Sequence, residues 1–196
     1  MPMNIRPENL APWLCGGAIG YRALKLTGTK EGEKLGLYGF GSSAHMVIQV
    51  ARYLGAEVYV FTRSEEHKRM AEELGAIWIG NPVDVPPTKL DAAIIFAPAG
   101  ELVINALRAL DRGGRLVLAG IYMSSIPSIE YSILWEERSL KSVANVTRED
   151  VREFTEIAKK IPVRTNVETF ELGEVNKALK KLKDGGIKGT GVLVMS

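Results

Sequence analysis

Short apolar runs alternate with amphipathic stretches along most of this chain. The runs have the length of buried strands, and we predict six of them, at 34–38, 57–62, 77–79, 91–96, 115–119 and 140–146. Stretches between them carry apolar residues at helical spacing, and the clearest predict helices at 45–54, 65–74 and 101–110. Strands that alternate with helices over short connections favour a parallel sheet covered on both faces. We therefore predict an α/β fold built on a doubly wound parallel sheet of six strands.

The two ends of the chain do not continue this sheet. Residues 11–26 predict a helical lead-in that is interrupted near Gly16 and Gly17. After the sixth strand the pattern predicts a helix, a strand, a second helix and a last strand, at 148–160, 167–171, 174–183 and 191–195. This terminal part has too little apolar surface to be a domain alone. The predicted division is a lead-in at 1–27, a main domain at 28–147 and a small α+β remnant of a second domain at 148–196.

The connection between the first strand and the following helix is a glycine motif, Gly39-Phe-Gly41-Ser-Ser-Ala44. In this setting Gly39 permits a tight turn, Gly41 lets the backbone approach a pyrophosphate, and Ala44 lets helix and strand pack closely. The N–H groups at the start of the helix would face the phosphates, and the hydroxyls of Ser42 and Ser43 could donate to them. The alternative is a plain structural turn. We predict a dinucleotide site here, in a Rossmann-type NAD(P)-binding domain.

The end of the second strand indicates which nicotinamide cofactor this domain takes. An Asp or Glu there normally accepts hydrogen bonds from the adenosine ribose, but this chain has Thr62, Arg63 and Ser64 and no carboxylate before Glu65. The guanidinium can form a charge-assisted pair with a 2′-phosphate, the two hydroxyls can donate to it, and Lys68 follows one helical turn later. We predict NADP; the alternative is that Arg63 is an exposed loop residue and the cofactor is NAD. Three residues after the fourth and fifth strands complete the predicted cofactor site: Ala97, Gly120 and Ile121.

Composition and charge narrow the class of protein. The chain has 196 residues, 46% of them hydrophobic and 24% charged, which is ordinary for a globular protein. A net charge of +2 favours neither a nucleic acid nor an acidic membrane surface as partner. The lysines of 177–183 indicate the solvent-exposed face of an amphipathic helix. One cysteine excludes an internal disulfide and favours the cytoplasm. No apolar run has the length of a membrane span, and the N-terminus has no hydrophobic signal core.

Several segments beyond the glycine motif are similar to those of one enzyme family. The lead-in at 11–25, the segments at 134–139 and 167–172 and the closing stretch at 187–194 resemble the medium-chain, zinc-type alcohol dehydrogenases. This resemblance covers essentially the whole chain. It implies the coenzyme-binding domain and C-terminal tail of a two-domain oxidoreductase, in which hydride passes between a nicotinamide and an alcohol or carbonyl substrate. The catalytic domain of the family would lie mostly before Ala11 and is missing from this sequence.

The resemblance also implies a role for Cys15. In the family this position supplies one ligand of the catalytic zinc, and a cysteine and a histidine of the missing domain supply the others. We therefore expect Cys15 to be a buried or partly exposed thiol without metal. Two departures from the family lie near the cofactor: Ile19, where threonine is usual near the nicotinamide, and Thr190, where arginine is usual near the pyrophosphate. Both would weaken binding at the reactive end.

Three functions stay open at this point. The first is the NADP(H)-binding part of an alcohol dehydrogenase or related reductase, inactive as an isolated chain. The second is a non-catalytic nucleotide-binding module, or a subunit completed by a separate catalytic-domain chain. The third is a zinc-free relative resembling the quinone reductases, against which Cys15 argues mildly. We also expect a homodimer, because dimers of the family often pair through the sixth strand, here 140–146.

Overall fold

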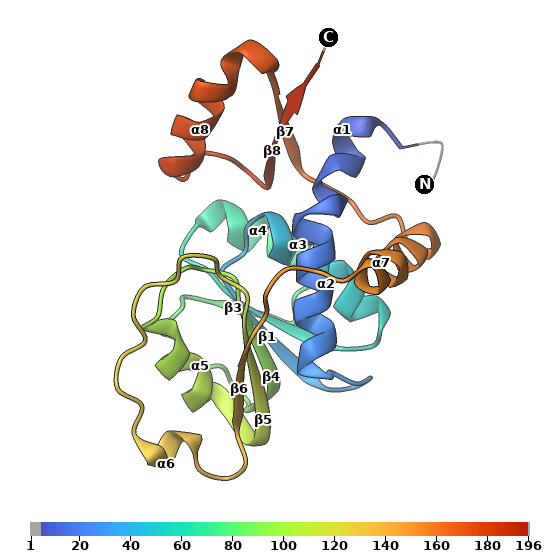
Figure 1. Ribbon diagram of the computed structural model, residues 1–196. Helices are drawn as coiled ribbons and strands as arrows, with labels where there is room; N and C mark the ends of the chain where they lie inside the picture. The colour runs from blue at the N-terminus through green and yellow to red at the C-terminus, as the bar shows by residue number, and fades with distance from the viewer. Residues whose placement is uncertain (1–4, 196) are drawn as a thin grey trace.

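Six parallel strands form one sheet in the order β3-β2-β1-β4-β5-β6 (Figure 1). This computed structural model describes residues 5–195, so that residues 1–4 and 196, at the outer ends of the predicted lead-in and tail, lie outside the described part. The strands are β1 Lys34–Tyr38, β2 Glu57–Phe61, β3 Trp78–Gly80, β4 Leu90–Ile95, β5 Leu110–Leu118 and β6 Ser139–Ser142. The predicted doubly wound sheet of six parallel strands is confirmed.

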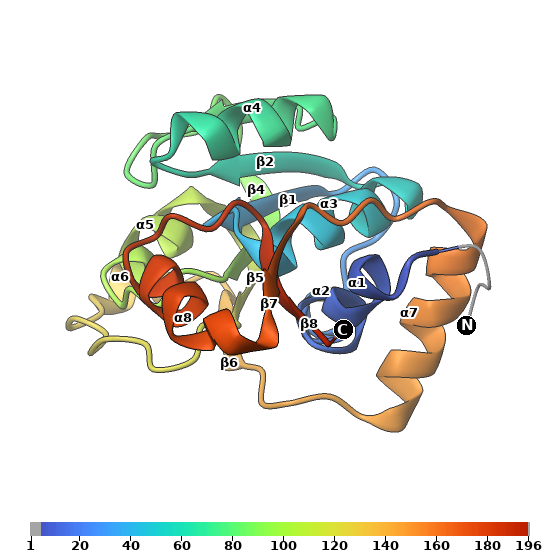
Figure 2. The ribbon, with the colours of Figure 1, turned by 90° about the horizontal axis from the view of Figure 1, so that it is seen from above.

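Both faces of this sheet are buried under helices. Side chains alternate along each strand, so that in β4 Ala92 and Ile94 pack into one core while Ala93 and Ile95 pack into the other. The helices that cover the two faces (Figures 1 and 2) are α2 Gly16–Thr27, α3 Ser42–Tyr53 and α4 Glu65–Glu73 on one side, and α5 Leu102–Ala109 and α6 Tyr131–Leu134 on the other. Two buried faces explain why the strands appear in the sequence as apolar runs. Within residues 5–195, no helix combines the length and the apolarity that crossing a bilayer requires.

The lead-in packs into the first of these cores. Two short elements precede α2: α1 Pro7–Leu10 and a 3-10 helix at Ala11–Leu14. The helical path breaks at Cys15, directly before the predicted interruption at Gly16 and Gly17. On the outer side of α2 lies α7 (Arg148–Lys160), where the ring of Phe154 meets Trp13 edge to face, with centroids 5.8 Å apart. Both α2 and α7 are therefore joined to the main sheet by buried side chains, and the domain boundaries at 27/28 and 147/148 stay a prediction.

A buried carboxylate ties α7 to α2. Asp150 accepts hydrogen bonds from the Thr147 N–H (2.8 Å) and from the Arg22 guanidinium (2.7 Å). The Thr147 hydroxyl accepts from the Asp150 N–H in return, which completes the capping box that begins α7. Burial alone would raise the pKa of Asp150, but the hydrogen bonds from Thr147 and Arg22 outweigh it and lower the pKa to about 2. The ionised carboxylate is therefore part of the folded structure at neutral pH.

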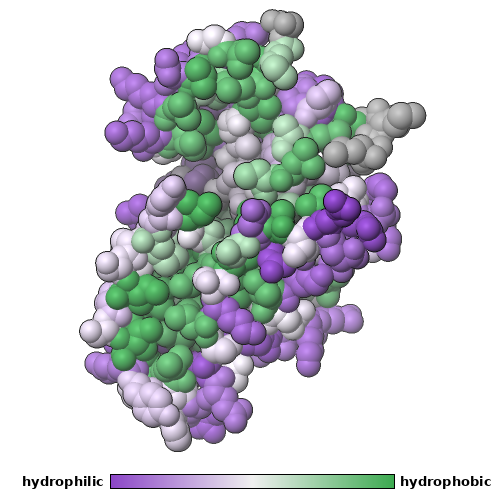
Figure 3. Space-filling model, viewed as in Figure 1, coloured by the Kyte–Doolittle hydropathy of each residue, from purple (hydrophilic) through white to green (hydrophobic). Residues whose placement is uncertain are grey.

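Beyond α7 the chain forms a second sheet of two parallel strands, which we call the small unit together with the elements that connect them. Its elements are β7 Val167–Glu171, a 3-10 helix at Leu172–Glu174, α8 Val175–Lys183 and β8 Thr190–Val194. Phe170 and Val192 are buried, whereas α8 buries no residue. Exposed apolar side chains, among them Leu179 and Leu182, give this unit the apolar surface seen at the top of Figure 3. The small unit therefore buries few apolar residues, and its assignment as the remnant of a second domain stays a prediction.

Two strand boundaries differ from the sequence prediction by more than one residue. β5 begins at Leu110 instead of at 115, because Leu110 already pairs with Leu90 before an irregularity in the register. β6 ends at Ser142 instead of at 146. After it only Val143 still donates to β5, and Asn145 turns the chain away with a left-handed φ of 56°.

Candidate functional site

A cleft of about 1020 Å³ opens at the carboxyl ends of β1, β2 and β4. It lies at the point where the strand order reverses, because β1 has β2 on one side and β4 on the other. Open α/β sheets bind ligands at such switch points, and the volume suits a large small-molecule ligand. The structure brings these predicted site residues together in the cleft wall: Gly39, Gly41, Ser42, Ser43, Thr62, Arg63, Ser64 and Ala97.

The two glycines of the motif lie in different surroundings. Gly39 has a left-handed φ of 86°, and a Cβ on it would lie 2.9 Å from the backbone nitrogen of Ala97 at the end of β4. At Gly41 a Cβ would meet no atom within 4 Å, so it would project into open space at the cleft. The turn thus fits tightly against β4 on one side and leaves room for a ligand on the other.

The helix after the turn begins earlier than predicted. α3 starts at Ser42 instead of at 45, and no side chain caps it. The hydroxyls of Ser42 and Ser43 line the cleft, while Ala44 is fully buried in the core, where a small residue lets α3 approach β1. Ser42 is also hydrogen-bonded through its hydroxyl to the hydroxyl of Thr190, which brings the small unit to the rim of the cleft.

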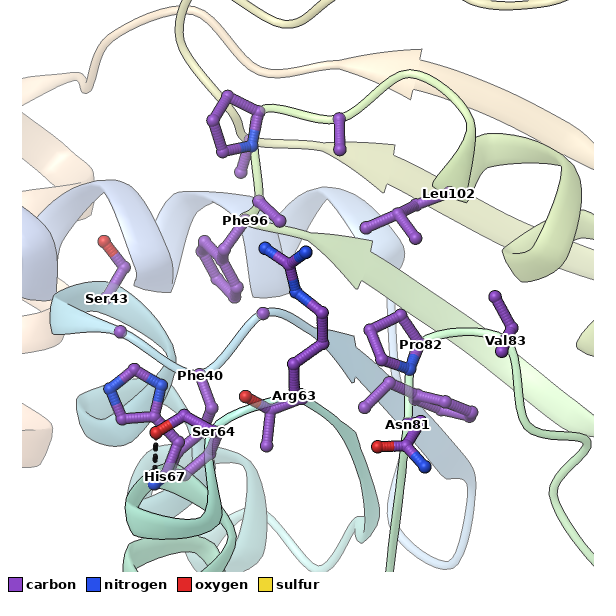
Figure 4. A pocket seen from close by; sticks show the side chains of 18 of the residues that line it. Phe40, Ser43, Arg63, Ser64, His67, Asn81, Pro82, Val83, Phe96 and Leu102 are labelled. Atoms are coloured by element: carbon purple, nitrogen blue, oxygen red, sulfur yellow. Dashed lines mark hydrogen bonds between the residues drawn. The ribbon is translucent and has the colours of Figure 1, made fainter. Parts of the chain in front are cut away.

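At the end of β2, Arg63 points into the cleft. Figure 4 shows its side chain rising between Pro82 and Phe96. Within the described residues 5–195, no carboxylate forms an ion pair with Arg63. Thr62 is buried beside it, and Ser64 is the N-cap of α4, as predicted, because its hydroxyl accepts from the His67 N–H at 3.4 Å.

Lys68 stands just outside the cleft wall. Its ammonium pairs with Glu65 at 2.8 Å, and the hydrogen bond from Lys68 lowers the pKa of Glu65. The same ammonium donates to the amide oxygen of Asn81 at 3.2 Å, and Asn81 lines the cleft. His67 also lines it, and burial lowers the pKa of its imidazole. The positive charge available in the cleft without a partner is therefore that of Arg63.

The predicted residues after β5 lie at the margin of the cleft and outside its wall. Gly120 packs against Ala97 and Pro98, since a Cβ on it would lie 3.1 Å from the Ala97 carbonyl oxygen. Ile121 is 78% exposed, and the wall position after β5 belongs to Ala119.

Sequence reasoning missed a large part of the wall. Most of the missed residues follow β1, β3, β4 or β5 or end β2, where the carboxyl-end rule could have found them, and His67 lies on α4. They are Phe40, Phe61, His67, Asn81, Pro82, Val83, Phe96, Pro98, Ala99, Glu101, Leu102 and Ala119. Most of them are apolar, so the cleft combines a polar end with an apolar part.

Cys15 is not part of the cleft wall and lies at the break before α2, where it is exposed; the expectation was a buried or partly exposed thiol. In the part of the chain that the structure describes, no three His, Cys, Asp or Glu side chains come together in a way that could hold a metal ion. The donors present therefore do not fit a zinc site, and no chemistry of this chain is assigned to zinc.

Known proteins match the chain over nearly all its length. Residues 44–160 match the family model described as zinc-binding dehydrogenase. The probable alcohol dehydrogenase AdhA of Mycobacterium tuberculosis (strain CDC 1551 / Oshkosh) is 44% identical over 196 residues, which is 100% of this chain and 57% of that protein. The chain thus spans just over half the length of this relative.

Solved structures share the fold. CAD from Helicobacter pylori, complexed with NADP(H), has a TM-score of 0.87 at 24% identity and covers 98% of this chain and 56% of its own. Acetophenone reductase from Geotrichum candidum, in complex with NAD, has a TM-score of 0.87 at 20% identity. The match covers 98% of this chain and 57% of the reductase chain. These two show the fold, and the family follows from the sequence matches. The chain belongs to the zinc-binding dehydrogenase family.

Proposed function

We propose that this chain is the NADP(H)-binding part of a zinc-type alcohol dehydrogenase or reductase. One observation carries the choice of cofactor: Arg63 points into the cleft beside the glycine turn and has no carboxylate partner within residues 5–195. A guanidinium in this position can pair with a 2′-phosphate, whereas the carboxylate usual for NAD would repel it. The H. pylori neighbour with NADP(H) agrees with this choice, and the neighbour with NAD shows that the fold alone does not decide it.

In this proposal each part of the cleft has a separate task. Arg63 and Ser64 bind the 2′-phosphate, and the N–H groups at the start of α3 bind the pyrophosphate with the hydroxyls of Ser42 and Ser43. The apolar wall around Phe96 and Leu102 takes up the flat parts of the dinucleotide. The bound cofactor supplies the hydride chemistry, and the protein orients it.

Turnover is proposed to need more than this chain. Hydride transfer to a carbonyl requires a group that stabilises charge on the substrate oxygen, and residues 5–195 hold no metal-binding cluster that could do so. The relatives are nearly twice as long, so we expect the chain alone to bind NADPH without turning it over. The alternative, a non-catalytic nucleotide module, differs in that no added catalytic-domain chain would restore activity.

A titration of NADPH and NADH against the purified chain tests the cofactor proposal. Energy transfer from the three tryptophans to the reduced nicotinamide reports binding. Arg63→Gln should weaken NADPH binding by about tenfold or more, the worth of a charged hydrogen bond, and leave NADH unchanged. Arg69→Gln is the matched control, because Arg69 is an exposed arginine of α4 outside the cleft wall. Equal affinities of the unmodified chain for NADPH and NADH would contradict the proposal.

We also propose a homodimer through β6. This strand is at the edge of the main sheet, and among the described strands it pairs only with β5, so that its other side can offer backbone groups to a second copy. Multi-angle light scattering tests this, since the dimer should have twice the chain mass of 21.4 kDa. A single monomeric species at micromolar concentration would contradict it.

A further inference from the structure

A buried histidine lies directly behind the glycine turn, and the proposed function does not use it. His45, in the first turns of α3, is 1% exposed and does not line the cleft. Its Nδ1 is 3.1 Å from the carbonyl oxygen of Gly41, which also accepts the backbone N–H of His45 at 3.2 Å. Its Nε2 is 3.2 Å from the backbone nitrogen of Asn166, the residue before β7. One imidazole thus contacts both the glycine turn and the residue that precedes β7.

These two contacts require one tautomer. The Asn166 N–H can only donate, so Nε2 must carry a lone pair. The Gly41 carbonyl can only accept, so Nδ1 must carry the proton. Only the neutral imidazole protonated at Nδ1 satisfies both. Burial, which lowers the pKa of His45, keeps the ring neutral.

The contacts of His45 belong to a closed circuit of hydrogen bonds. The carbonyl of Asn166 accepts the N–H of Thr190 at 2.9 Å. The hydroxyl of Thr190 is bonded to that of Ser42. Ser42 shares a peptide group with Gly41, whose carbonyl returns the circuit to His45. Segments more than a hundred residues apart in the sequence are therefore joined in one ring.

The circuit determines where a phosphate-binding N–H points. The Gly41–Ser42 peptide is planar, and in a trans peptide the C=O and the N–H point in opposite directions. Two donors of His45 hold the C=O toward the body of α3, so the N–H of Ser42 is held outward, toward the cleft that its side chain lines. We propose that His45 is a positioning residue that sets the direction of the Ser42 N–H toward the cofactor pyrophosphate and ties it to the placement of β7. This inference rests on the proposed dinucleotide site.

Ligands with and without a pyrophosphate test the inference. His45→Phe keeps a ring but removes both polar contacts, and should weaken NADPH binding about tenfold, the worth of one well-aimed hydrogen bond to a charged group. Adenosine 2′-monophosphate has no pyrophosphate, so its affinity should stay within about twofold. His45→Asn can still donate to Gly41 from its side-chain amide and should restore part of the NADPH affinity.

Gln49→Leu is the matched control. Gln49 lies one turn after His45 and holds the same tail segment, since it donates to the Arg164 carbonyl at 2.9 Å and accepts its N–H at 2.8 Å. It does not touch Gly41, so NADPH affinity should stay unchanged. Equal losses of NADPH affinity in His45→Phe and Gln49→Leu would show that the affinity depends only on holding the segment at 164–166 in place, and would overturn the inference. So would an equal loss for NADPH and adenosine 2′-monophosphate.

The tautomer gives a test that needs no ligand and no variant. The chain has two histidines, so the ¹⁵N imidazole signals of His45 and His67 can be separated. We expect a protonated Nδ1 and an unprotonated Nε2 at His45, and the opposite tautomer would overturn the inference even if NADPH binds. If the unmodified chain binds neither NADPH nor adenosine 2′-monophosphate, the proposed function fails, and the positioning role fails with it. If it binds both and His45→Phe binds NADPH normally, only the positioning role fails.

Discussion

The main sheet and the small unit are both parallel, yet different interactions hold them. In the main sheet side chains such as Ile94 are fully buried, and helices cover both faces. In the small unit Phe170 and Val192 are buried, but α8 buries no residue and Leu182 is 60% exposed. Removing a buried aliphatic side chain from a core costs about 2–5 kcal/mol, whereas a typical hydrogen bond contributes about 1 kcal/mol.

The small unit contacts α1 and the 3-10 helix at Ala11–Leu14 through β7 and β8, and polar side chains of α3 add hydrogen bonds to this part of the chain. Three residues on successive turns of α3 bond to the C-terminal part of the chain. Ser42 bonds to Thr190, His45 to Asn166 and Gln49 to Arg164. Polar contacts fix direction well but add little free energy. We therefore expect the small unit to open at a lower free energy than the main sheet, and the predictions below test that difference.

The largest contrast should come from matched truncations in the two regions. Ile94→Ala leaves a cavity at the centre of β4 and should lower the free energy of unfolding by about 4 kcal/mol. Leu182→Ala, on the exposed side of α8, should lower it by less than about 0.5 kcal/mol. Urea denaturation followed by circular dichroism measures both. Similar losses would mean that the small unit has a covered core of its own.

A substitution of Asp150 tests whether α7 contributes to the stability of the main sheet. Asp150→Ala removes the capping box and leaves Arg22 without its buried partner, so it should lower the free energy of unfolding by about 3 kcal/mol. Glu149→Gln, on the exposed side of the same helix, is the control and should change little.

The same residue predicts a pH dependence. The folded pKa of Asp150, about 2, lies below the unfolded value of about 3.9, so between these values the unfolded state binds more protons. The stabilisation is therefore complete above about pH 4 and is lost as the pH falls toward 2. Stability curves from pH 7 to pH 2 should fall less steeply at the acid end for Asp150→Ala. Parallel curves for the variant and the unmodified chain would contradict this account.

A substitution of Phe170, in the small unit, tests whether the small unit opens independently of the main sheet. Phe170→Ala should lower the free energy of local opening of β7 and β8 by about 2 kcal/mol, less than in a fully packed core. Amide hydrogen exchange should show this loss in β7 and β8 and no change in β4. If protection in β4 fell by the same amount, the two regions would unfold as one cooperative body.

The smallest effect should come from Ser64, at the rim of the cleft. Its hydroxyl caps α4 through a long contact of 3.4 Å, so Ser64→Ala should cost about 0.5 kcal/mol, at the low end for an N-cap. Thermal unfolding of Ser64→Ala beside Ser64→Thr, which keeps the hydroxyl, measures it. A loss of 2 kcal/mol or more would mean that Ser64 does more than cap the helix.

Elements with local signals were predictable from the sequence. The predicted helix at 148–160 has its observed ends there, and its ends carry local signals: the structure shows a capping box of Thr147 and Asp150 and two lysines in the last turn. The glycine turn was predicted from its spacing together with the apolar run before it and the helical pattern after it. The start of β5 was not, because Leu110 joins the sheet through Leu90, a partner that no local pattern reveals.

Residues of the cleft wall after β1, β2 and β4 were identified from the sequence, but none after β3. Arg63 was found from its place after β2, but Asn81 and Val83 join it through the neighbouring strand β3. The bonds of Ser42 to Thr190 and of His45 to Asn166 cross more than a hundred residues. Pairing at that distance depends on how the whole chain folds, so no short window of sequence contains it.

The bond between Ser42 and Thr190 links the proposed nucleotide site to β8, so that nucleotide binding and the ordering of the small unit are coupled in free energy. If an ordered tail strengthens nucleotide binding by some amount, the bound nucleotide must strengthen the order of the tail by the same amount. A protease that cuts only the opened tail would then be slowed in proportion to nucleotide occupancy. If the proposed cofactor site is correct, the rate of cleavage within 167–194 would therefore report how much of the chain has cofactor bound.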